Sequence, residues 1–540
     1  MKPPAHFAFA YLRSHRAIGR SQSPMTLRFL LPLLTVLLLS GIADAQTKIR
    51  VEADKPGPTI DKHIYGQFAE HLGRGIYEGI WVGEGSPIPN TRGFRNDVLA
   101  ALKDLRVPVV RWPGGCYADQ YHWTDGIGPR GQRKKTVNAS WGGVVDDNAF
   151  GTHEFFDLVE QLGADAYVSI NVGTGSPREM AEWVEYMTSD ADSTLANLRR
   201  RNGRKKPWRV QYLGVGNETW GCGGSMTPEY YTDVYKQFAT FIKTPEDNRP
   251  VVIASGGHDR QTNWTQQLLG HVEESWTLRL DGISHHYYTL PTGNWERKGA
   301  ALGFPENEWF STLFRTLQIR GFLASNVRVM NQLDKKKKVG FFLDEWGTWY
   351  DSAEGASQSS LLQQNSLRDA VLAALNFNVF HEFAERLRMT NIAQMVNVLQ
   401  AMILTDGPRM LLTPTYHAFH LYRPFQGARR VPAVVRGAPE YRQGAESIPK
   451  ISATAGLASD GKLYLALVNT HPRDSERVHV DGSSPITKAS GRLLTGSGLD
   501  AHNTFAEPNR VRPTAVEFTG TKGSLELTLP PRSILVLALE

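Results

Sequence analysis

The chain has 540 residues, too many for one compact hydrophobic core, so we expect more than one domain. With 41% hydrophobic and 21% charged residues, its composition is that of a globular protein. The net charge of +6 comes mainly from residues 1–45, which contribute +4 and leave +2 for the remainder. This near-neutral balance excludes the basic surface that nucleic-acid binding requires, so no nucleic-acid partner is expected.

The N-terminal stretch MTLRFLLPLLTVLLLSGIADAQ has the features of an export signal. Arg28 precedes an apolar run, and Ala43 and Ala45 form a small-residue cleavage pattern. The run is too short to span a membrane and no other long apolar stretch follows, so no membrane span is expected. We predict that residues 1–45 are an export signal, with translation starting at Met1 or Met25. Cleavage near Ala45 would leave a periplasmic or secreted protein.

Between residues 63 and 410 the chain alternates short apolar strands with amphipathic helical segments. Strands that are apolar on both faces and separated by helices are typical of a parallel sheet. Eight such units favour a (β/α)₈ barrel over an open doubly wound sheet. The predicted strands are residues 63–70, 107–114, 164–173, 210–218, 249–257, 281–288, 339–347 and 387–397.

The pattern changes after residue 411. Segments such as KLYLALVNTH and GSLELTLP alternate apolar and polar residues between Gly, Pro, Ser and Asp, which predicts a β-sandwich, jelly-roll-like, over residues 411–540. The segment TKIRVEAD, within residues 46–62, reads as one further strand that joins this sandwich.

Two glutamates end predicted barrel strands and are each followed closely by a Trp. They are Glu218 after the fourth strand and Glu345 after the seventh. Working residues of such barrels lie at the carboxyl ends of the strands, and a facing carboxylate pair is what glycoside hydrolysis requires. The alternative is a structural role, with one or both glutamates salt-bridged to a barrel arginine such as Arg111. The presence of two such glutamates, each close to a Trp, favours a catalytic role over a structural one.

Other reactive groups give weaker signals. The only two cysteines, Cys116 and Cys222, provide no disulfide framework, although one bridge between them stays open. The segment HEFAE lacks the second His of H-E-x-x-H, and no G-x-G-x-x-G follows the first strand. We therefore expect neither a metal nor a cofactor.

Six motifs in chain order resemble glycoside hydrolase family 51, the α-L-arabinofuranosidases. They are FAEHLGRGIYEGIWV, VVRWPGGCYADQYHWTDGIGPR, GVGNETWGCGG, ISHHYYT, FLDEWGTWY and NIAQMVNVLQAMILT, spread over residues 60–425. The resemblance implies a (β/α)₈ barrel with a β-sandwich and a retaining double-displacement mechanism. It also implies that arabinofuranosyl-bearing plant polysaccharides or oligosaccharides are the substrates, and that the chain could form a homo-oligomer.

The resemblance also implies roles for individual residues. Glu345 resembles the nucleophile and Glu218 the acid/base, with a carboxyl separation of about 5–5.5 Å for a retaining enzyme. Arg111 resembles the arginine that keeps the nucleophile ionised. The remaining residues expected to contact or surround the sugar are Glu70, Cys116, Asn217, His286, Tyr288, Trp349 and Gln394.

Two other functions stay open at this stage. A retaining endo-xylanase or endo-glucanase on the same barrel would share Asn217-Glu218 and Glu345. A non-catalytic carbohydrate-binding protein would be expected to lose Glu218, Glu345 or Arg111, and the chain keeps all three. The predicted function is therefore exo-acting release of terminal α-L-arabinofuranosyl residues.

Overall fold

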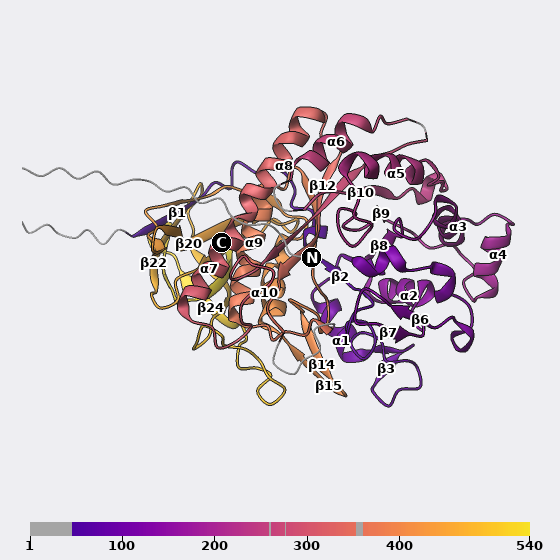
Figure 1. Ribbon diagram of the computed structural model, residues 1–540. Helices are drawn as coiled ribbons and strands as arrows, with labels where there is room; N and C mark the ends of the chain where they lie inside the picture. The colour runs from indigo at the N-terminus through magenta and orange to yellow at the C-terminus, as the bar shows by residue number, and fades with distance from the viewer. Residues whose placement is uncertain (1–45, 259–260, 276, 353–359) are drawn as a thin grey trace, which may run out of the picture. The chain divides into compact units, whose positions relative to one another are not determined.

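The computed structural model of the protein describes residues 46–258, 261–275, 277–352 and 360–540 (Figure 1). The predicted export signal, residues 1–45, lies outside these ranges. Within the described residues, no helix combines the length and apolar character needed to cross a membrane.

Eight parallel strands close into a barrel, which confirms the predicted fold class. Their order around the barrel is β10-β11-β12-β13-β2-β5-β8-β9. Each strand falls within or close to one of the predicted apolar segments, because strands covered by helices outside and by side chains inside must be apolar on both faces. The strands are β2 (Gly66–Phe68), β5 (Val109–Trp112), β8 (Asp165–Ile170), β9 (Tyr212–Val215), β10 (Val251–Ser255), β11 (Gly282–Thr289), β12 (Gly340–Thr348) and β13 (Leu387–Ile392).

Helices connect the strands and cover the barrel. Several begin at a Ser or Thr whose side chain accepts a hydrogen bond from the first turn, such as Ser176 before α3 and Thr227 before α5, each followed by Pro. Helix α9 is buried from Leu367 to His381, which explains why its apolar residues occur on every side of the helix. The helices are α1 (Asn96–Asp104), α2 (Thr152–Leu162), α3 (Pro177–Thr188), α4 (Thr194–Arg201), α5 (Pro228–Thr240), α6 (Asn263–His271), α7 (Glu306–Leu317), α8 (Ile319–Leu333), α9 (Leu367–Glu382) and α10 (Pro414–Tyr422).

The barrel interior is a packed core with a polar layer at one end. A buried cluster fills the interior, and it consists of Val109, Tyr167, Tyr212, Ile253, Phe342 and Met389. Two residues beyond Val109 on β5 is Arg111, and two beyond Phe342 on β12 is Asp344. Because side chains two apart point to the same face of a strand, both polar groups enter the barrel above the apolar cluster. The apolar cluster thus packs directly beneath the polar side chains at the carboxyl end of the barrel.

The C-terminal residues form two further sheets. One has the order β17-β1-β22-β25 and the other β16-β20-β21-β26-β23-β24. Strand β1 (Thr47–Val51), indigo in Figure 1, pairs antiparallel with β17 and parallel with β22. The strands are β16 (Arg429–Val431), β17 (Ala433–Arg436), β20 (Ile451–Leu457), β21 (Leu463–Asn469), β22 (Glu476–Gly482), β23 (Lys488–Leu494), β24 (Thr514–Thr519), β25 (Leu525–Leu529) and β26 (Ser533–Leu539).

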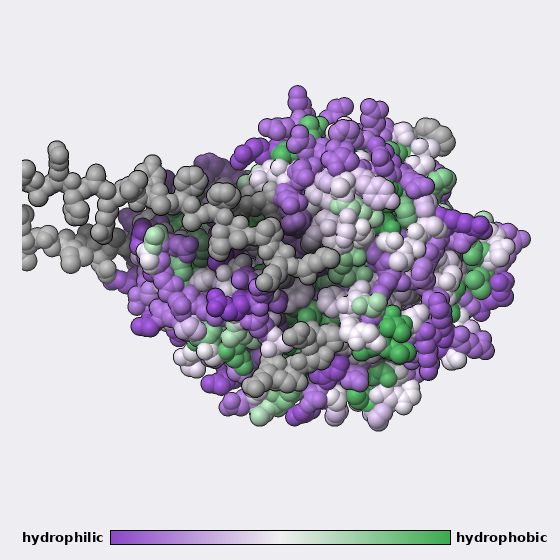
Figure 2. Space-filling model, in the orientation of Figure 1, coloured by the Kyte–Doolittle hydropathy of each residue, from purple (hydrophilic) through white to green (hydrophobic). Residues whose placement is uncertain are grey.

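Short hairpins decorate this framework. Two of them, β6–β7 (Thr136–Asn138 and Val144–Asp146) and β14–β15 (Ile403–Asp406 and Arg409–Leu412), follow barrel strands β5 and β13. The others are β3–β4 (Asn90–Thr91 and Phe94–Arg95) and β18–β19 (Glu440–Gln443 and Glu446–Pro449). On the face shown in Figure 2, hydrophilic residues prevail and hydrophobic residues form small separate groups.

Candidate active site

The carboxyl ends of the barrel strands surround one small cavity of about 50 Å³. Eight of the ten residues predicted for the site line it, and the other two, Arg111 and His286, are buried behind its carboxylates. The predicted residues in the wall are Glu70, Cys116, Asn217, Glu218, Tyr288, Glu345, Trp349 and Gln394. The wall is completed by Leu72, Gly115, Trp141, Leu361 and Leu399.

Glu345, on β12, is held by a different donor at each carboxylate oxygen. Arg111 Nη1 donates to Oε1 at 2.8 Å, and the Tyr288 hydroxyl donates to Oε2 at 2.8 Å. Arg111 is itself buried, with its guanidinium 4.6 Å from the centre of the Phe68 ring. Because both donors are anchored in the barrel, the Glu345 carboxylate has a fixed orientation toward the cavity.

His286, on β11, connects the two glutamates. Its Nδ1 lies 2.7 Å from Glu218 Oε1 and 3.4 Å from Glu345 Oε2. Burial alone would lower the pKa of His286, but the carboxylates of Glu345, Asp344 and Glu218 raise it to about 10. At neutral pH the ring is therefore a cation among three carboxyl groups. An oxygen from each glutamate and a His286 ring nitrogen all lie within 4.8 Å of one another.

Asp344 supports this arrangement from inside the barrel. Its carboxylate lies 3.4 Å from Arg111 Nε and 3.3 Å from His286 Nε2, and it accepts a 2.7 Å hydrogen bond from the Tyr167 hydroxyl. Burial tends to raise the pKa of Asp344, yet Arg111, His286 and Tyr167 together lower it to about 2. Asp344 is thus an anion beneath the site, although it was not among the ten residues predicted to form it.

Glu70, after β2, is the most heavily coordinated carboxylate of the pocket. Its Oε1 accepts hydrogen bonds from the backbone N–H of Gly115 and of Tyr117 and from Trp141 Nε1, at 3.0, 3.0 and 2.9 Å. Its Oε2 accepts from Gln394 Nε2 at 3.0 Å. Burial, and next the charge of Glu345, raise the pKa of Glu70 to about 7. The two glutamates therefore repel each other across the cavity.

Asn217 and Glu218 leave β9 in a tight turn. Asn217 accepts from Arg111 Nη2 through Oδ1 at 2.6 Å, and its backbone N–H donates to Asp119 Oδ2 at 3.0 Å. Glu218 has φ of 40°, in the left-handed region that non-glycine residues rarely adopt. A Cβ on Gly223 would lie 1.9 Å from the Asn217 carbonyl oxygen, so this glycine lets the turn fold back. The turn directs the Glu218 side chain toward His286.

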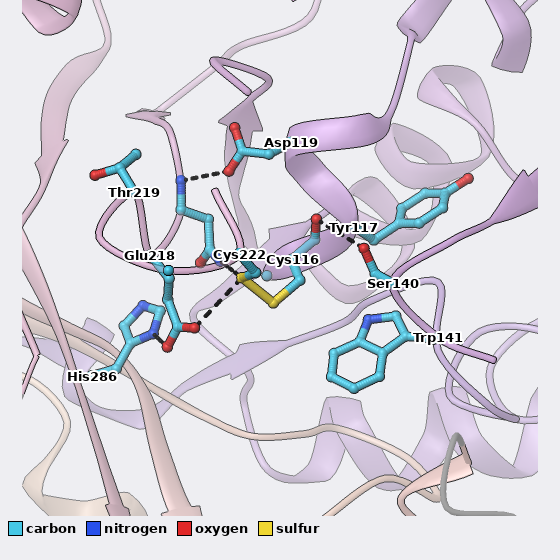
Figure 3. The surroundings of a disulfide bond; sticks show 12 residues. Cys116, Tyr117, Asp119, Ser140, Trp141, Glu218, Thr219, Cys222 and His286 are labelled. Atoms are coloured by element: carbon cyan, nitrogen blue, oxygen red, sulfur yellow. Dashed lines mark hydrogen bonds and ion pairs between the residues drawn. A yellow bond between two sulfur atoms is a disulfide. The ribbon is translucent and has the colours of Figure 1, made fainter. Parts of the chain in front are cut away.

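The two cysteines form a disulfide in this wall. Cys116 and Cys222 are bonded across 106 residues, with Cα atoms 5.5 Å apart. The bridge that the sequence left open is therefore present, and the bonded Cys116 sulfur carries no S–H donor for a sugar. Figure 3 shows Glu218 between the His286 ring and this bridge, with Cys222 Sγ 3.6 Å from Glu218 Oε2.

Aromatic side chains form the rim of the cavity. The ring of Tyr288 packs edge-on against Trp349, with centres 5.2 Å apart, and Trp349 in turn packs against Trp295, which is 53% exposed. Trp141, in the turn of the β6–β7 hairpin, was missed by the sequence prediction. The pair Gly142-Gly143, which follows Trp141 and precedes Val144 and Val145, is a hairpin signal that could have located it.

Gly115 explains the PGG motif and yields a test. A Cβ at this position would lie 2.7 Å from Glu345 Oε1, and one at Gly114 would lie 2.7 Å from Glu70 Cγ. We expect Gly115→Ala to displace the Glu345 carboxylate and lower kcat at least about tenfold, because small misplacements of reacting groups are costly. Steady-state kinetics with a thermal melt would measure this. Wild-type kcat in a variant that melts normally would contradict the assigned contact.

The charged state of His286 yields a second test. Its folded-state pKa is raised from 6.5 to about 10, so its contribution to stability is complete below pH 6.5 and disappears as the pH rises through 10. We expect the free energy of unfolding of the wild type to fall relative to that of His286→Gln across this window. Urea titrations at several pH values would measure it, and parallel curves for the two proteins would refute the charge assignment.

Comparison with known proteins finds relatives over nearly the whole chain. Residues 101–300 match the domain described as α-L-arabinofuranosidase 1 domain, and residues 344–533 match the α-L-arabinofuranosidase C-terminal domain. An intracellular exo-α-L-arabinofuranosidase of Bacteroides ovatus is 48% identical over 92% of this chain and 96% of its own.

Solved structures agree with the sequence relatives. The GH51 arabinofuranosidase of Xanthomonas axonopodis pv. citri superposes with a TM-score of 0.89 and 47% identity, covering 92% of this chain and 100% of its own. The α-L-arabinofuranosidase of Thermotoga maritima, solved as an arabinose complex, superposes with a TM-score of 0.80 and 32% sequence identity. The match covers 91% of this chain and 99% of the Thermotoga chain.

The predicted export is wrong. The Bacteroides relative, which aligns with 92% of this chain, is described as an intracellular enzyme. An apolar run behind a basic residue is a generic signal, and here it misled the sequence interpretation.

Proposed function

Because the chain belongs to the α-L-arabinofuranosidases of glycoside hydrolase family 51, we propose that it removes terminal α-L-arabinofuranosyl residues by a retaining double displacement. The observation that carries the proposal is the pair Glu218 and Glu345, whose oxygens lie within 4.8 Å of each other and of the His286 ring. Retaining glycosidases hold their carboxyl groups about 5–5.5 Å apart, whereas inverting ones leave about 6.5–9.5 Å for a water molecule.

In this proposal Glu345 is the nucleophile. Its carboxylate accepts hydrogen bonds from Arg111 and Tyr288, which hold it in position beside the cavity. It attacks the anomeric carbon as the bond to the leaving oxygen breaks, and a covalent glycosyl ester results.

Glu218 is the acid and then the base. It protonates the leaving oxygen in the first step and takes a proton from water in the second, when water attacks the ester and releases arabinose with retained configuration. His286 holds Glu218 in place through its 2.7 Å hydrogen bond.

The remaining polar residues bind the sugar. Glu70, Gln394 and Asn217 project into the cavity beside Glu345, where they can contact the hydroxyl groups of one furanose ring. Leu72, Leu361 and Leu399 close the cavity on its other sides. Such a pocket suits a chain end better than the interior of a polysaccharide, which supports exo action over an endo-xylanase or endo-glucanase.

The aromatic rim supports a site for the group to which arabinose is attached. Trp349 and Trp295 stand beside Tyr288 at the mouth, and sugars place their apolar C–H faces on such rings. Since the Bacteroides relative is described as intracellular, we propose arabinose-bearing oligosaccharides inside the cell as the substrates, rather than intact arabinan or arabinoxylan. Assembly as a homo-oligomer stays a prediction.

Hydrolysis of p-nitrophenyl α-L-arabinofuranoside, p-nitrophenyl β-xyloside and soluble cellulose by the full chain tests the activity. We expect hydrolysis of the arabinofuranoside, with little of the other two. Proton NMR of the first product should show the retained anomer. Cleavage of cellulose in preference to the arabinofuranoside, or an inverted first product, would overturn the proposal.

A further inference from the structure

The disulfide joins two loops of the active site directly beside the carboxyl group that we propose as acid/base. Cys116 begins the turn after β5, whereas Cys222 lies in the glycine-rich turn after Glu218. Cys222 is exposed, so a small thiol can reach its sulfur. Such a bond is unusual in a protein whose relative is described as intracellular, because cellular thiols keep most cysteines reduced.

In the disulfide the two sulfurs are bonded to each other, and they already lie close to a carboxylate oxygen of Glu218. One oxygen of Glu218 and both Sγ atoms lie within 4.8 Å of one another. Two thiolates and a carboxylate are a ligand set that suits Zn²⁺, with sulfur ligands at about 2.3 Å and oxygen at about 2.0–2.2 Å. Two sulfurs on one tetrahedral ion stand roughly 3.8 Å apart, a separation that rotation of the freed side chains can supply.

We propose that reduction of Cys116–Cys222 converts this wall of the pocket into an inhibitory site for a thiophilic divalent cation such as Zn²⁺. Two molecules of a low-molecular-weight thiol reduce the S–S bond, become one external disulfide, and leave two protein thiols. The cation then displaces one proton from each thiol and forms two metal–sulfur bonds and one bond to a Glu218 oxygen. A fourth position stays open to water, and the oxidised enzyme has no such site.

The consequence for activity follows from Glu218. A carboxylate bound to a metal can neither give nor take the proton that each step needs, and the ion would occupy the sugar cavity. The activity part of this inference rests on the proposed function, whereas metal binding by the reduced cysteines does not.

Metal binding to the full chain tests the inference without reference to activity. One sample stays oxidised, and another is reduced with a phosphine that is then removed under argon. Both are dialysed against micromolar ZnCl₂ and, in parallel, CoCl₂. We expect one Zn²⁺ per reduced chain and none per oxidised chain, with thiolate-to-cobalt charge-transfer absorption in the reduced sample alone. Reduced Cys222→Ser should lose that absorption and most of the binding.

Activity on p-nitrophenyl α-L-arabinofuranoside gives the second readout. Zn²⁺ should lower the rate of the reduced enzyme at least about tenfold, EDTA should restore it, and Mg²⁺, which prefers oxygen ligands, should have no effect. Equal zinc binding by oxidised and reduced protein, no zinc binding by the reduced protein, or binding unchanged in Cys222→Ser would each overturn the proposal. An oxidised enzyme inactive on the aryl substrate would instead count against the proposed function.

Discussion

Glu345→Ala is expected to abolish turnover on every arabinofuranoside, with kcat at least about 10⁴-fold lower than in the wild type. The substitution removes the atom that we propose forms the covalent bond, so a better leaving group cannot compensate. It also leaves Arg111 Nη1 and the Tyr288 hydroxyl without their acceptor, and we expect a loss of about 1–3 kcal/mol in unfolding free energy. Single-turnover kinetics and urea denaturation measure the two effects.

A matched control separates catalysis from folding. Glu229 is an exposed glutamate in the first turn of α5, remote from these contacts, so Glu229→Ala should keep wild-type kinetics and stability. Glu345→Gln retains the shape of the side chain and should fold well while staying inactive. A folded Glu345→Ala protein with near-normal rates would show that another group is the nucleophile.

Glu218→Ala should give the second-largest effect, with a dependence on the leaving group that Glu345→Ala lacks. Without the acid, substrates with a poor leaving group should react about 10²–10⁴-fold more slowly, whereas an aryl arabinofuranoside should still form the glycosyl ester. Without the base, that ester should accumulate, producing a burst of phenol followed by slow turnover. Pre-steady-state absorbance measurements would detect the burst.

Rescue by azide is a second test of the acid/base role of Glu218. It needs no general base to attack the ester, so it should speed release in Glu218→Ala and yield an arabinofuranosyl azide with retained configuration. It should have no such effect on the wild type. Equal slowing of aryl and natural substrates, with no response to azide, would argue against an acid/base role for Glu218.

The barrel was predictable because its strands are buried on both faces and hence apolar throughout. The same reasoning located Glu218 and Glu345. A carboxylate at the end of a buried strand is costly to desolvate, so it is expected either to pair with a charged group or to take part in catalysis. The prediction of Glu70 and Gln394 as site residues rested on the resemblance of their motifs to the family. In the structure a hydrogen bond joins their side chains across 324 residues, a contact that apolar periodicity alone could not reveal.

The features of the site that the sequence did not predict are contacts between loops. The Cys116–Cys222 bond requires the turns after β5 and β9 to meet, although β8 separates these strands in the barrel. Asp119, in the turn after β5, is a similar case. Its carboxylate accepts hydrogen bonds from the backbone N–H groups of Val172 and Gly173 after β8 and of Asn217 after β9. Neither apolar periodicity nor a local motif encodes which loop ends meet.

Trapping the covalent intermediate tests the central claim most directly. The full chain would be incubated with a 2-deoxy-2-fluoro-α-L-arabinofuranoside bearing a dinitrophenyl leaving group, digested, and analysed by tandem mass spectrometry. The fluorine slows both steps, and the good leaving group keeps formation of the ester faster than its hydrolysis. The mechanism predicts one fluoroarabinosyl group per chain, attached to Glu345. A label on Glu218 or on any other residue would contradict it.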